Sequence, residues 1–501
     1  MTQEAGLSTP GVGVGVEGTT RRSRWLEGKW DTWLVMAVAA VVLTLVLFDR
    51  LADPPLWDAV WTTSAGAAEL SRNGFDYAAL LAAPPFDEGG PGTHASSLLT
   101  PLLGLFFVLF GSPGGLVAGH ILMIGVGSAL VASTFALGKR YLPPWVALAV
   151  AGAVVSLPLI VQQVADPYVD LPLALCTVLT VIAFLDGNRV RAAAFAALAV
   201  WFKPTGLMLL PLVALMGSHG ETQRWLKNGM ASLVAVAPFS IVLMGQNMGT
   251  HAGATPTLDG TLTLMRNAFW ILGATTDVLV ILFLFFIGAS RQRGKQRELV
   301  KATGIVTLSF FAFHVLTMML SQVVTILPRY YIAVVPLWLV VVAVYLVDAH
   351  SQKAASALLI GLILFSVVNW NGTFYPLADH PQAPMAERTP GGGREYLQME
   401  MAGTTALVEA ADEVDLLVLD NAVNFRVRYP ELGFVDEVPD NIVLGLTGQE
   451  ELPNSFAWLQ EPHISPSATP AEIAAERGLN LERTTIWDGR WQSDLVRAAQ
   501  P

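Results

Sequence analysis

Long runs of apolar residues follow one another from about residue 30 to about residue 370. Most runs contain about 17 to 25 residues, which is the length that an α-helix needs to cross the hydrocarbon core of a bilayer. The pattern therefore predicts an all-α polytopic membrane protein. The apolar segments are 31–49, 95–111, 115–138, 145–163, 169–186, 190–202, 204–217, 229–246, 268–289, 302–326, 330–348 and 354–370.

Lys and Arg between these segments indicate which of them cross the membrane, because cytoplasmic loops are enriched in both residues. If the N-terminus is inside and 95–111 crosses, the main basic clusters fall outside. If 95–111 instead lies flat on the outer surface as a juxtamembrane helix, they all fall inside. This second arrangement predicts eleven spans, with the C-terminus outside. The clusters are Lys139 and Arg140, Arg189 and Arg191, Arg224 and Lys227, and Arg291, Arg293, Lys295, Arg297 and Lys301.

The composition changes at both ends of the hydrophobic region, which defines the domains. Residues 1–29 are polar and predict a disordered cytoplasmic tail. A membrane domain follows at 30–370 with an outer loop region at 50–114, and then a Pro/Gly-rich linker at 371–393. We expect 394–501 to form a small α/β domain outside the membrane. Its predicted strands are Leu416–Leu419, Phe434–Val438 and Ile442–Leu446, and its predicted helix lies near Pro470–Arg477.

Overall composition and charge narrow the class of protein. With 53% hydrophobic and 14% charged residues, the chain is not an ordinary soluble enzyme. The single cysteine, Cys176, excludes a disulfide framework and a Cys-based metal site. A net charge of −11 argues against nucleic acid as a partner.

An acid in the first outer loop is the first candidate for chemistry. Asp58 lies between Trp57 and Trp61, in a stretch at 57–73 whose apolar residues have helical spacing. A carboxylate beside an aromatic surface can act as a general base or bind a divalent ion. Acids in loops also commonly face water, so a functional and a structural role are equally open for Asp58. The candidate buried positions of the helix are Trp57, Val60, Trp61 and Ala68.

Two more acids, Asp166 and Asp170, lie at the outer end of the segment 169–186. The Asp166-Pro167 pair predicts a helix start, with Asp166 capping and Pro167 in the first helical position, so a capping role and a functional role are equally open for Asp166. Asp170 lies four residues later and therefore within the span. An ionisable group there is costly unless it faces a cavity or a partner, which favours a functional role.

Two cations, Lys203 and Arg329, begin the segments that run from the outer to the inner face. A positive side chain at a helix N-terminus opposes the helix dipole. It is explained if an anion such as phosphate binds there, because the exposed N–H groups and the cation both attract it. The alternative is that both side chains extend to the lipid headgroups.

The order of these motifs resembles the GT-C class of membrane glycosyltransferases, and within it the protein O-mannosyltransferases and the aminoarabinose transferase of lipid A. The resemblance covers about residues 30–350. The matching stretches are Leu56-Trp57-Asp58-Ala59, Gly92-Thr93-His94-Ala95, Leu99-Thr100-Pro101-Leu102, Asp166 through Pro172, Trp201-Phe202-Lys203-Pro204-Thr205-Gly206, and Pro328-Arg329-Tyr330 through Pro336.

The resemblance implies an inverting transferase in the cytoplasmic (inner) membrane. It would move a sugar from a polyprenyl phosphate to a hydroxyl of a lipid, glycan or protein on the outer face. Asp58 would be the base, and Lys203 and Arg329 would hold the donor phosphate. Asp170 and Asp166 would orient a substrate, or Asp58 and Asp170 would hold a divalent cation such as Mg or Mn. His94 and Tyr330 would contact substrate.

Two other classes remain open from the residues alone. A transporter or lipid flippase would explain the Pro-broken helices around Lys203, but transporters place their charges nearer the midplane. A scaffold that binds partners through its acidic tail would leave the outer acids and cations unexplained. A catalytic site predicts that Asp58, Asp170, Lys203 and Arg329 converge within about 10–15 Å in one pocket.

Overall fold

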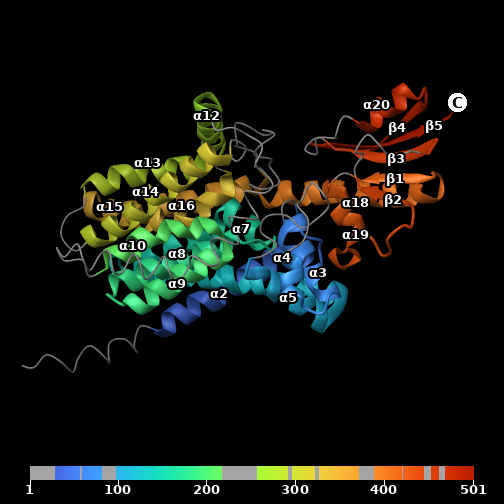
Figure 1. Ribbon diagram of the computed structural model, residues 1–501. Helices are drawn as coiled ribbons and strands as arrows, with labels where there is room; N and C mark the ends of the chain where they lie inside the picture. The colour runs from blue at the N-terminus through green and yellow to red at the C-terminus, as the bar shows by residue number, and fades with distance from the viewer. Residues whose placement is uncertain are drawn as a thin grey trace, which may run out of the picture.

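The computed structural model describes residues 29–56, 59–81, 97–216, 257–291, 296–321, 327–371, 389–419, 421–444, 453–461 and 469–500. This part of the chain forms a long helical body with a smaller domain, which contains a β-sheet, at one end (Figure 1). The predicted tail at 1–28 and the predicted span at 229–246 lie outside the described residues.

The helices of the body have the length and composition of membrane spans. In the described part, four are long and apolar enough to cross a membrane, and a bent pair makes a fifth candidate. Large apolar side chains such as Leu45, Phe286 and Leu364 are exposed on their outer sides, as lipid-facing residues are. The chain is therefore a multi-pass membrane protein, while the number of eleven spans stays a prediction.

The first two predicted apolar segments have boundaries close to those predicted. Helix α2 (Lys29–Leu47) packs against α5 (Leu99–Gly138). Gly111 (φ 64°, ψ −172°) and Ser112 interrupt α5, so a first segment ending near residue 110 is separate from the span that follows. The break lies between the predicted segments 95–111 and 115–138.

The loop between α2 and α5 folds into short helices: η1 (Phe48–Arg50), η2 (Val60–Ser64), α3 (Ala65–Arg72) and α4 (Tyr77–Leu81). The helix predicted at 57–73 is thus confirmed from Val60 onwards, with Val60 and Ala68 buried, whereas Trp61 is only partly buried. Trp57 lies outside the described residues.

The next helices correct two predictions. The expected span 145–163 is a pair of helices, α6 (Pro144–Ser156) and α7 (Pro158–Val164), bent by 63°. The bend follows from Pro158, because the residue before a proline is restricted to extended backbone, here Leu157 with ψ 124°. The predicted cap at Asp166 is wrong, since α8 (Asp170–Leu185) begins only at Asp170.

Ion pairs join the ends of these helices that lie away from the sheet domain. Lys139 pairs with Asp31 and Arg140 pairs with Asp186, each at 2.7 Å. These pairs bring the start of α2, the end of α5 and the end of α8 together. The two predicted short spans follow as α9 (Arg189–Phe202) and as η4 (Pro204–Leu209) continued by α10 (Leu210–Leu215).

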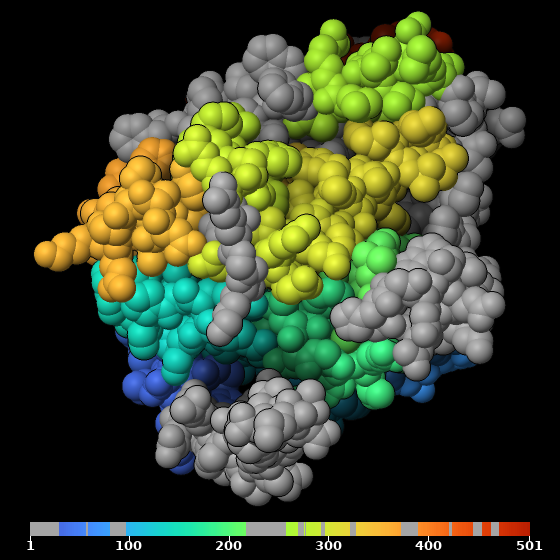
Figure 2. Space-filling model, turned by 90° about the vertical axis from the view of Figure 1, so that its left-hand side faces the viewer, coloured from blue at the N-terminus to red at the C-terminus, as the bar shows by residue number. Residues whose placement is uncertain are grey.

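The second half of the body forms a layer above the first when viewed end-on (Figure 2). The predicted span 268–289 is wrong in its bounds, because two helices meet there at Thr275. Figure 1 shows the first of them, α12, turned across the direction of α13. Helix α15 is buried along nearly its whole length and forms the centre of this layer. The elements are α12 (Leu258–Ala274), α13 (Thr276–Arg291), α14 (Gln296–Ser321), η5 (Pro328–Ala333), α15 (Val335–Ala349), α16 (Gln352–Val368) and η6 (Asn369–Asn371).

The C-terminal domain contains a five-stranded sheet with strand order β2-β1-β3-β5-β4. Strand β1 is parallel to β2 and β3, whereas β5 is antiparallel to β3 and β4. The first helix, α18, begins inside the predicted linker 371–393. The elements are α18 (Pro390–Glu409), η7 (Ala410–Asp412), β1 (Leu416–Leu419), α19 (Asn421–Arg428), η8 (Pro430–Leu432), β2 (Ile442–Leu444), β3 (Ser455–Gln460), α20 (Thr469–Glu476), β4 (Asn480–Asp488) and β5 (Gln492–Ala499).

Predictions for this domain were partly right. The strands at Leu416 and Ile442 and the helix near Pro470 are confirmed. The strand predicted at Phe434–Val438 is wrong. Phe434 is buried in the same apolar cluster as residues of the membrane body, so its apolar character reflects contact between domains and not a sheet.

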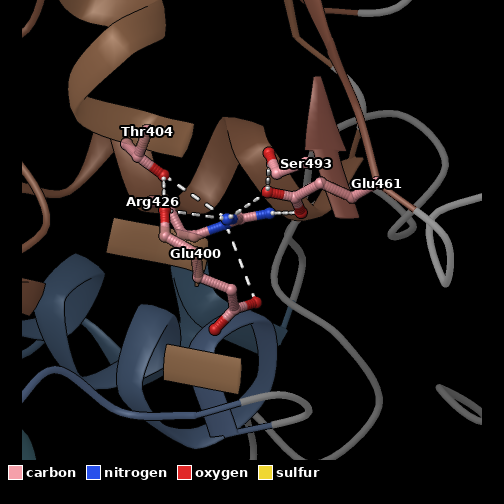
Figure 3. A network of polar contacts seen from close by, with 5 residues as sticks. All are labelled: Glu400, Thr404, Arg426, Glu461 and Ser493. Atoms are coloured by element: carbon pink, nitrogen blue, oxygen red, sulfur yellow. Dashed lines mark hydrogen bonds and ion pairs between the residues drawn. The ribbon is translucent and has the colours of Figure 1, made fainter. Parts of the chain in front are cut away.

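A buried arginine links the helices of this domain to its sheet (Figure 3). Arg426 on α19 donates hydrogen bonds of 2.7 and 3.3 Å to Glu461, which follows β3, and one of 3.3 Å to the carbonyl oxygen of Glu400 on α18. Burial by itself would lower the pKa of Arg426, but the carboxylates of Glu461 and Glu400 outweigh burial and raise it. The charged bonds therefore fix how α18 and α19 pack on the sheet.

Candidate active site

A buried ion cluster lies where α8, α9 and η5 meet. Lys203 Nζ donates a hydrogen bond of 2.7 Å to Asp170 Oδ1, and Arg329 Nε lies 3.5 Å from Asp170 Oδ2. The exposed fractions are 1% for Asp170 and 3% for each of the two cations. Three of the predicted site residues thus converge in direct contact, although they are far apart in sequence.

The turn between α9 and η4 places Lys203 in the cluster. Helix α9 ends at Phe202, and Lys203 is extended (φ −154°, ψ 138°) as expected before Pro204. A Cβ atom on Gly206 would lie 2.5 Å from the backbone of Ala199, so only glycine allows this turn to pack so closely on α9. The Lys-Pro-Thr-Gly sequence therefore folds back tightly and directs the lysine at Asp170.

Two tyrosine rings lie beside both cations. Lys203 Nζ is 3.8 Å from the ring centre of Tyr330 and 5.8 Å from that of Tyr168. Arg329 Cζ is 4.9 Å from the ring centre of Tyr168 and 5.5 Å from that of Tyr330. These distances are within the range of cation–π attraction, so the rings hold the cations in place. Tyr330, predicted to contact substrate, is therefore at the cluster.

His314 is a residue of this site that sequence reasoning missed. It lies within the apolar segment of α14. Its Nδ1 donates to the carbonyl oxygen of Phe310 in the same helix, at 2.8 Å. Its ring centre lies 5.2 Å from that of Tyr330. The signal that could have identified it is its polarity inside an otherwise apolar span.

The structure gives Asp166 a different environment from that of Asp170. Asp166 Oδ1 accepts a hydrogen bond of 3.1 Å from the backbone N–H of Leu56. Next to it, the hydroxyl of Thr63 donates to the carbonyl oxygen of Pro167 at 3.0 Å. The turn after α7 thus binds the first loop on both sides of position 58. Asp58 itself, and likewise His94, lies outside the described residues.

The arrangement suits an anion better than a metal ion. The carboxylate of Asp170 faces two cations, which favours an ion-pair role for Asp170 over metal ligation. Within the part of the chain that the structure describes, no group of three His, Cys, Asp or Glu side chains is arranged to hold a metal. Arg and Lys together are the usual ligands of phosphate groups. The charges of the cluster are therefore suited to binding a phosphate.

The helical membrane body with a sheet domain at one end is a fold that this chain shares with solved structures of a membrane transferase. Two solved structures that match nearly the whole chain are those of ArnT from Cupriavidus metallidurans, a lipid A aminoarabinose transferase. The crystal structure of ArnT bound to undecaprenyl phosphate has a TM-score of 0.53 and 15% identity, over 95% of this chain and 98% of that chain. The apo form has a TM-score of 0.52 and 14% identity, over 94% and 98%. No protein-family model and no curated protein matches the sequence.

These likenesses show a shared fold along nearly the entire length of both chains. The fold is the one implied by the order of the sequence motifs. At 14% and 15% identity, the comparison does not identify the functions of individual residues. Those functions are argued from the geometry of this chain.

Proposed function

We propose that this protein is a glycosyltransferase that takes a sugar from a polyprenyl phosphate and transfers it to a hydroxyl acceptor on the outer face of the cytoplasmic membrane. The observation that carries the proposal is the buried cluster of Lys203, Arg329 and Asp170. It lies in the fold of an enzyme that was crystallised with undecaprenyl phosphate.

In the proposed reaction, Asp58 takes the proton of the acceptor hydroxyl, and the oxygen attacks the anomeric carbon of the sugar. The bond from that carbon to the phosphate oxygen breaks, and the oxygen keeps the electron pair. The polyprenyl phosphate thereby gains a negative charge. Lys203 and Arg329 stabilise this charge, and the attack from the opposite side inverts the anomeric centre.

Asp170 has a supporting role in this proposal. Without donor, its carboxylate balances one of the two buried positive charges, which are costly at membrane depth. One carboxylate faces two cations, so one positive charge is left to attract the donor phosphate. Lys203 and Arg329 can therefore bind the phosphate and keep their contacts with Asp170. If a divalent ion such as Mg or Mn takes part, Asp58 is its candidate ligand.

Sugar transfer in proteoliposomes tests the proposal. Labelled polyprenyl-phosphate sugars are supplied to the purified wild type, to Asp58→Asn and to Asp76→Asn, with and without EDTA. Asp76 is an exposed acid of the same loop that caps α4, and Asn caps a helix equally well, so the control should keep full activity.

Transfer by the wild type and the control, and not by Asp58→Asn, supports both the enzyme class and the base. Full transfer by Asp58→Asn would contradict the role of Asp58 as the general base. A wild type that moves a lipid or solute across the bilayer and transfers no sugar from any donor overturns the enzyme class in favour of a transporter or flippase.

A further inference from the structure

The C-terminal domain contacts the first loop through one turn of helix α3. Arg72 makes a two-pronged ion pair with Glu431, with Nε and Nη2 at 2.7 and 2.6 Å from the two carboxylate oxygens. Its Nη1 donates to the carbonyl oxygen of Arg428 at 3.2 Å, and its guanidinium lies 4.9 Å from the ring centre of Tyr429. The Arg72 side chain thus contacts Arg428, Tyr429 and Glu431 of the C-terminal domain.

A second residue of α3 adds to this junction. Tyr429 donates a hydrogen bond of 2.9 Å to Glu69 Oε2, and Glu69 Oε1 accepts one of 2.6 Å from Asn73. A single exposed ion pair contributes about 0–1 kcal/mol. Here the bidentate geometry, the backbone bond and the buried tyrosine make one connected network, which fixes orientation as well as distance.

The domain also contacts the loop before position 58, and the helix that leads to Asp166. Gly433 packs against Pro54 and Leu116, where an added Cβ would lie 3.6 and 3.3 Å from their side chains. At Gly393 an added Cβ would lie 2.5 Å from Gln162 of α7. The domain is therefore in contact with both segments that carry the candidate acids.

We propose that the C-terminal domain positions the acid-bearing first loop through Arg72, so that the domain acts on the transfer step and not on donor binding. The inference rests on the proposed function. The donor cations come from other elements, α9 and η5, and are held by Asp170 and two tyrosine rings. Neither cation lies on the first loop, so a shift of that loop acts directly on the candidate base. In this view Arg72 is a positioning residue.

Charge reversal across the ion pair tests this inference. Arg72→Glu, Glu431→Arg and the double variant are compared with the wild type in proteoliposomes. The control is Arg483→Glu, which breaks an ion pair with Asp494 inside the sheet, where the arginine side chain is 57% exposed and Asp494 is buried. The measurements are kcat, the affinity for polyprenyl phosphate, and amide hydrogen exchange in residues 59–72.

Each single variant should lower kcat by about 10- to 100-fold, because a displacement of about 1 Å at a reacting group has effects of that size. Donor affinity should stay unchanged, and exchange in 59–72 should rise. The double variant should restore kcat and exchange, and Arg483→Glu should change neither. A merely structural loss would lower donor binding together with kcat, whereas this inference predicts a loss of kcat alone.

Three results would overturn the inference: wild-type kcat in Arg72→Glu, a loss of donor affinity equal to the loss of activity, or a double variant that stays as impaired as the single ones. If the wild type transfers no sugar, the proposed function fails by itself. Hydrogen exchange then still decides the coupling, since unchanged exchange in Arg72→Glu would refute it.

Discussion

Lys203 and Asp170 form a 2.7 Å ion pair whose two side chains are almost completely buried, at the junction of α8 and α9. A buried ion pair is weak evidence for stability as a whole, because both charges lose their hydration. Removing one partner is different, since the other charge then remains buried without compensation. The pair therefore links the stability of the body to the integrity of the candidate phosphate site.

Replacing Asp170 by Asn should destabilise the protein strongly. The substitution leaves two buried cations facing a neutral amide, and losses of about 3–5 kcal/mol are typical of such sites. The matched control is Asp186→Asn, which breaks the partly exposed pair with Arg140 and should cost about 0–1 kcal/mol. Thermal unfolding of both variants in detergent measures the difference, and equal losses would contradict a special role for the buried cluster.

Asp166 should tolerate replacement by Asn better than by Ala. In the structure it acts as a hydrogen-bond acceptor for Leu56 N–H, and an Asn side chain keeps an oxygen acceptor while Ala leaves the buried N–H unsatisfied, at about 1–3 kcal/mol. We expect Asp166→Asn to retain most sugar transfer and Asp166→Ala to lose it. Equal loss of kcat in both variants, with normal stability, would show that the negative charge itself takes part in the reaction.

Replacing His314 should change donor affinity according to the shape of the new side chain. Its ring packs against Tyr330, which in turn lies over the Lys203 ammonium group. Because an aromatic pair contributes about 0.5–1.5 kcal/mol, His314→Leu should weaken binding of polyprenyl phosphate by about 2- to 10-fold. His314→Phe keeps the ring and should bind normally. A Phe variant as weak as the Leu variant would mean that the imidazole itself is required.

The junction between the C-terminal domain and α3 should weaken at high pH. Burial, and then the neighbouring Glu69 carboxylate, raise the pKa of the Tyr429 hydroxyl above its ordinary value of 10.0. A group with a raised pKa stabilises the folded state fully below its unfolded pKa and loses that contribution as the pH rises through the folded pKa. Stability should therefore fall above about pH 10.

Tyr429→Phe isolates this contribution, since it removes the titrating hydroxyl and keeps the ring. Unfolding midpoints of wild type and variant are compared from pH 8 to 11. The wild type should lose its advantage over the variant as the pH passes about 10. A constant difference across the whole range would show that the tyrosine does not titrate with folding.

Much of the fold was predictable because membrane spans are defined locally. The apolar runs, the interruption of α5 at Gly111 and Ser112, and the Lys203-Pro204 turn between two short helices are all set by neighbouring residues. The candidate cations were likewise recognisable, because a positive side chain at a helix N-terminus opposes the helix dipole. The class of fold followed from the order of these local signals.

The partners of the candidate residues were not predictable from local signals. Asp166 looks like a helix cap in sequence, yet its partner is Leu56, 110 residues earlier. Phe434 looks like part of a strand, yet it packs against the membrane body. In each case the local pattern shows whether a residue is polar or apolar. The element that it contacts depends on how segments distant in sequence pack together.

The sequence by itself determined that this protein is a multi-pass membrane protein with acids and cations at one end of its helices, because hydropathy and charge act over a few turns of helix. Only the tertiary structure decided that Lys203 and Arg329 share one carboxylate, that His314 belongs to their surroundings, and that the C-terminal domain binds the first loop through Arg72. The physical reason is that buried charges must find their partners wherever the packed helices bring them together.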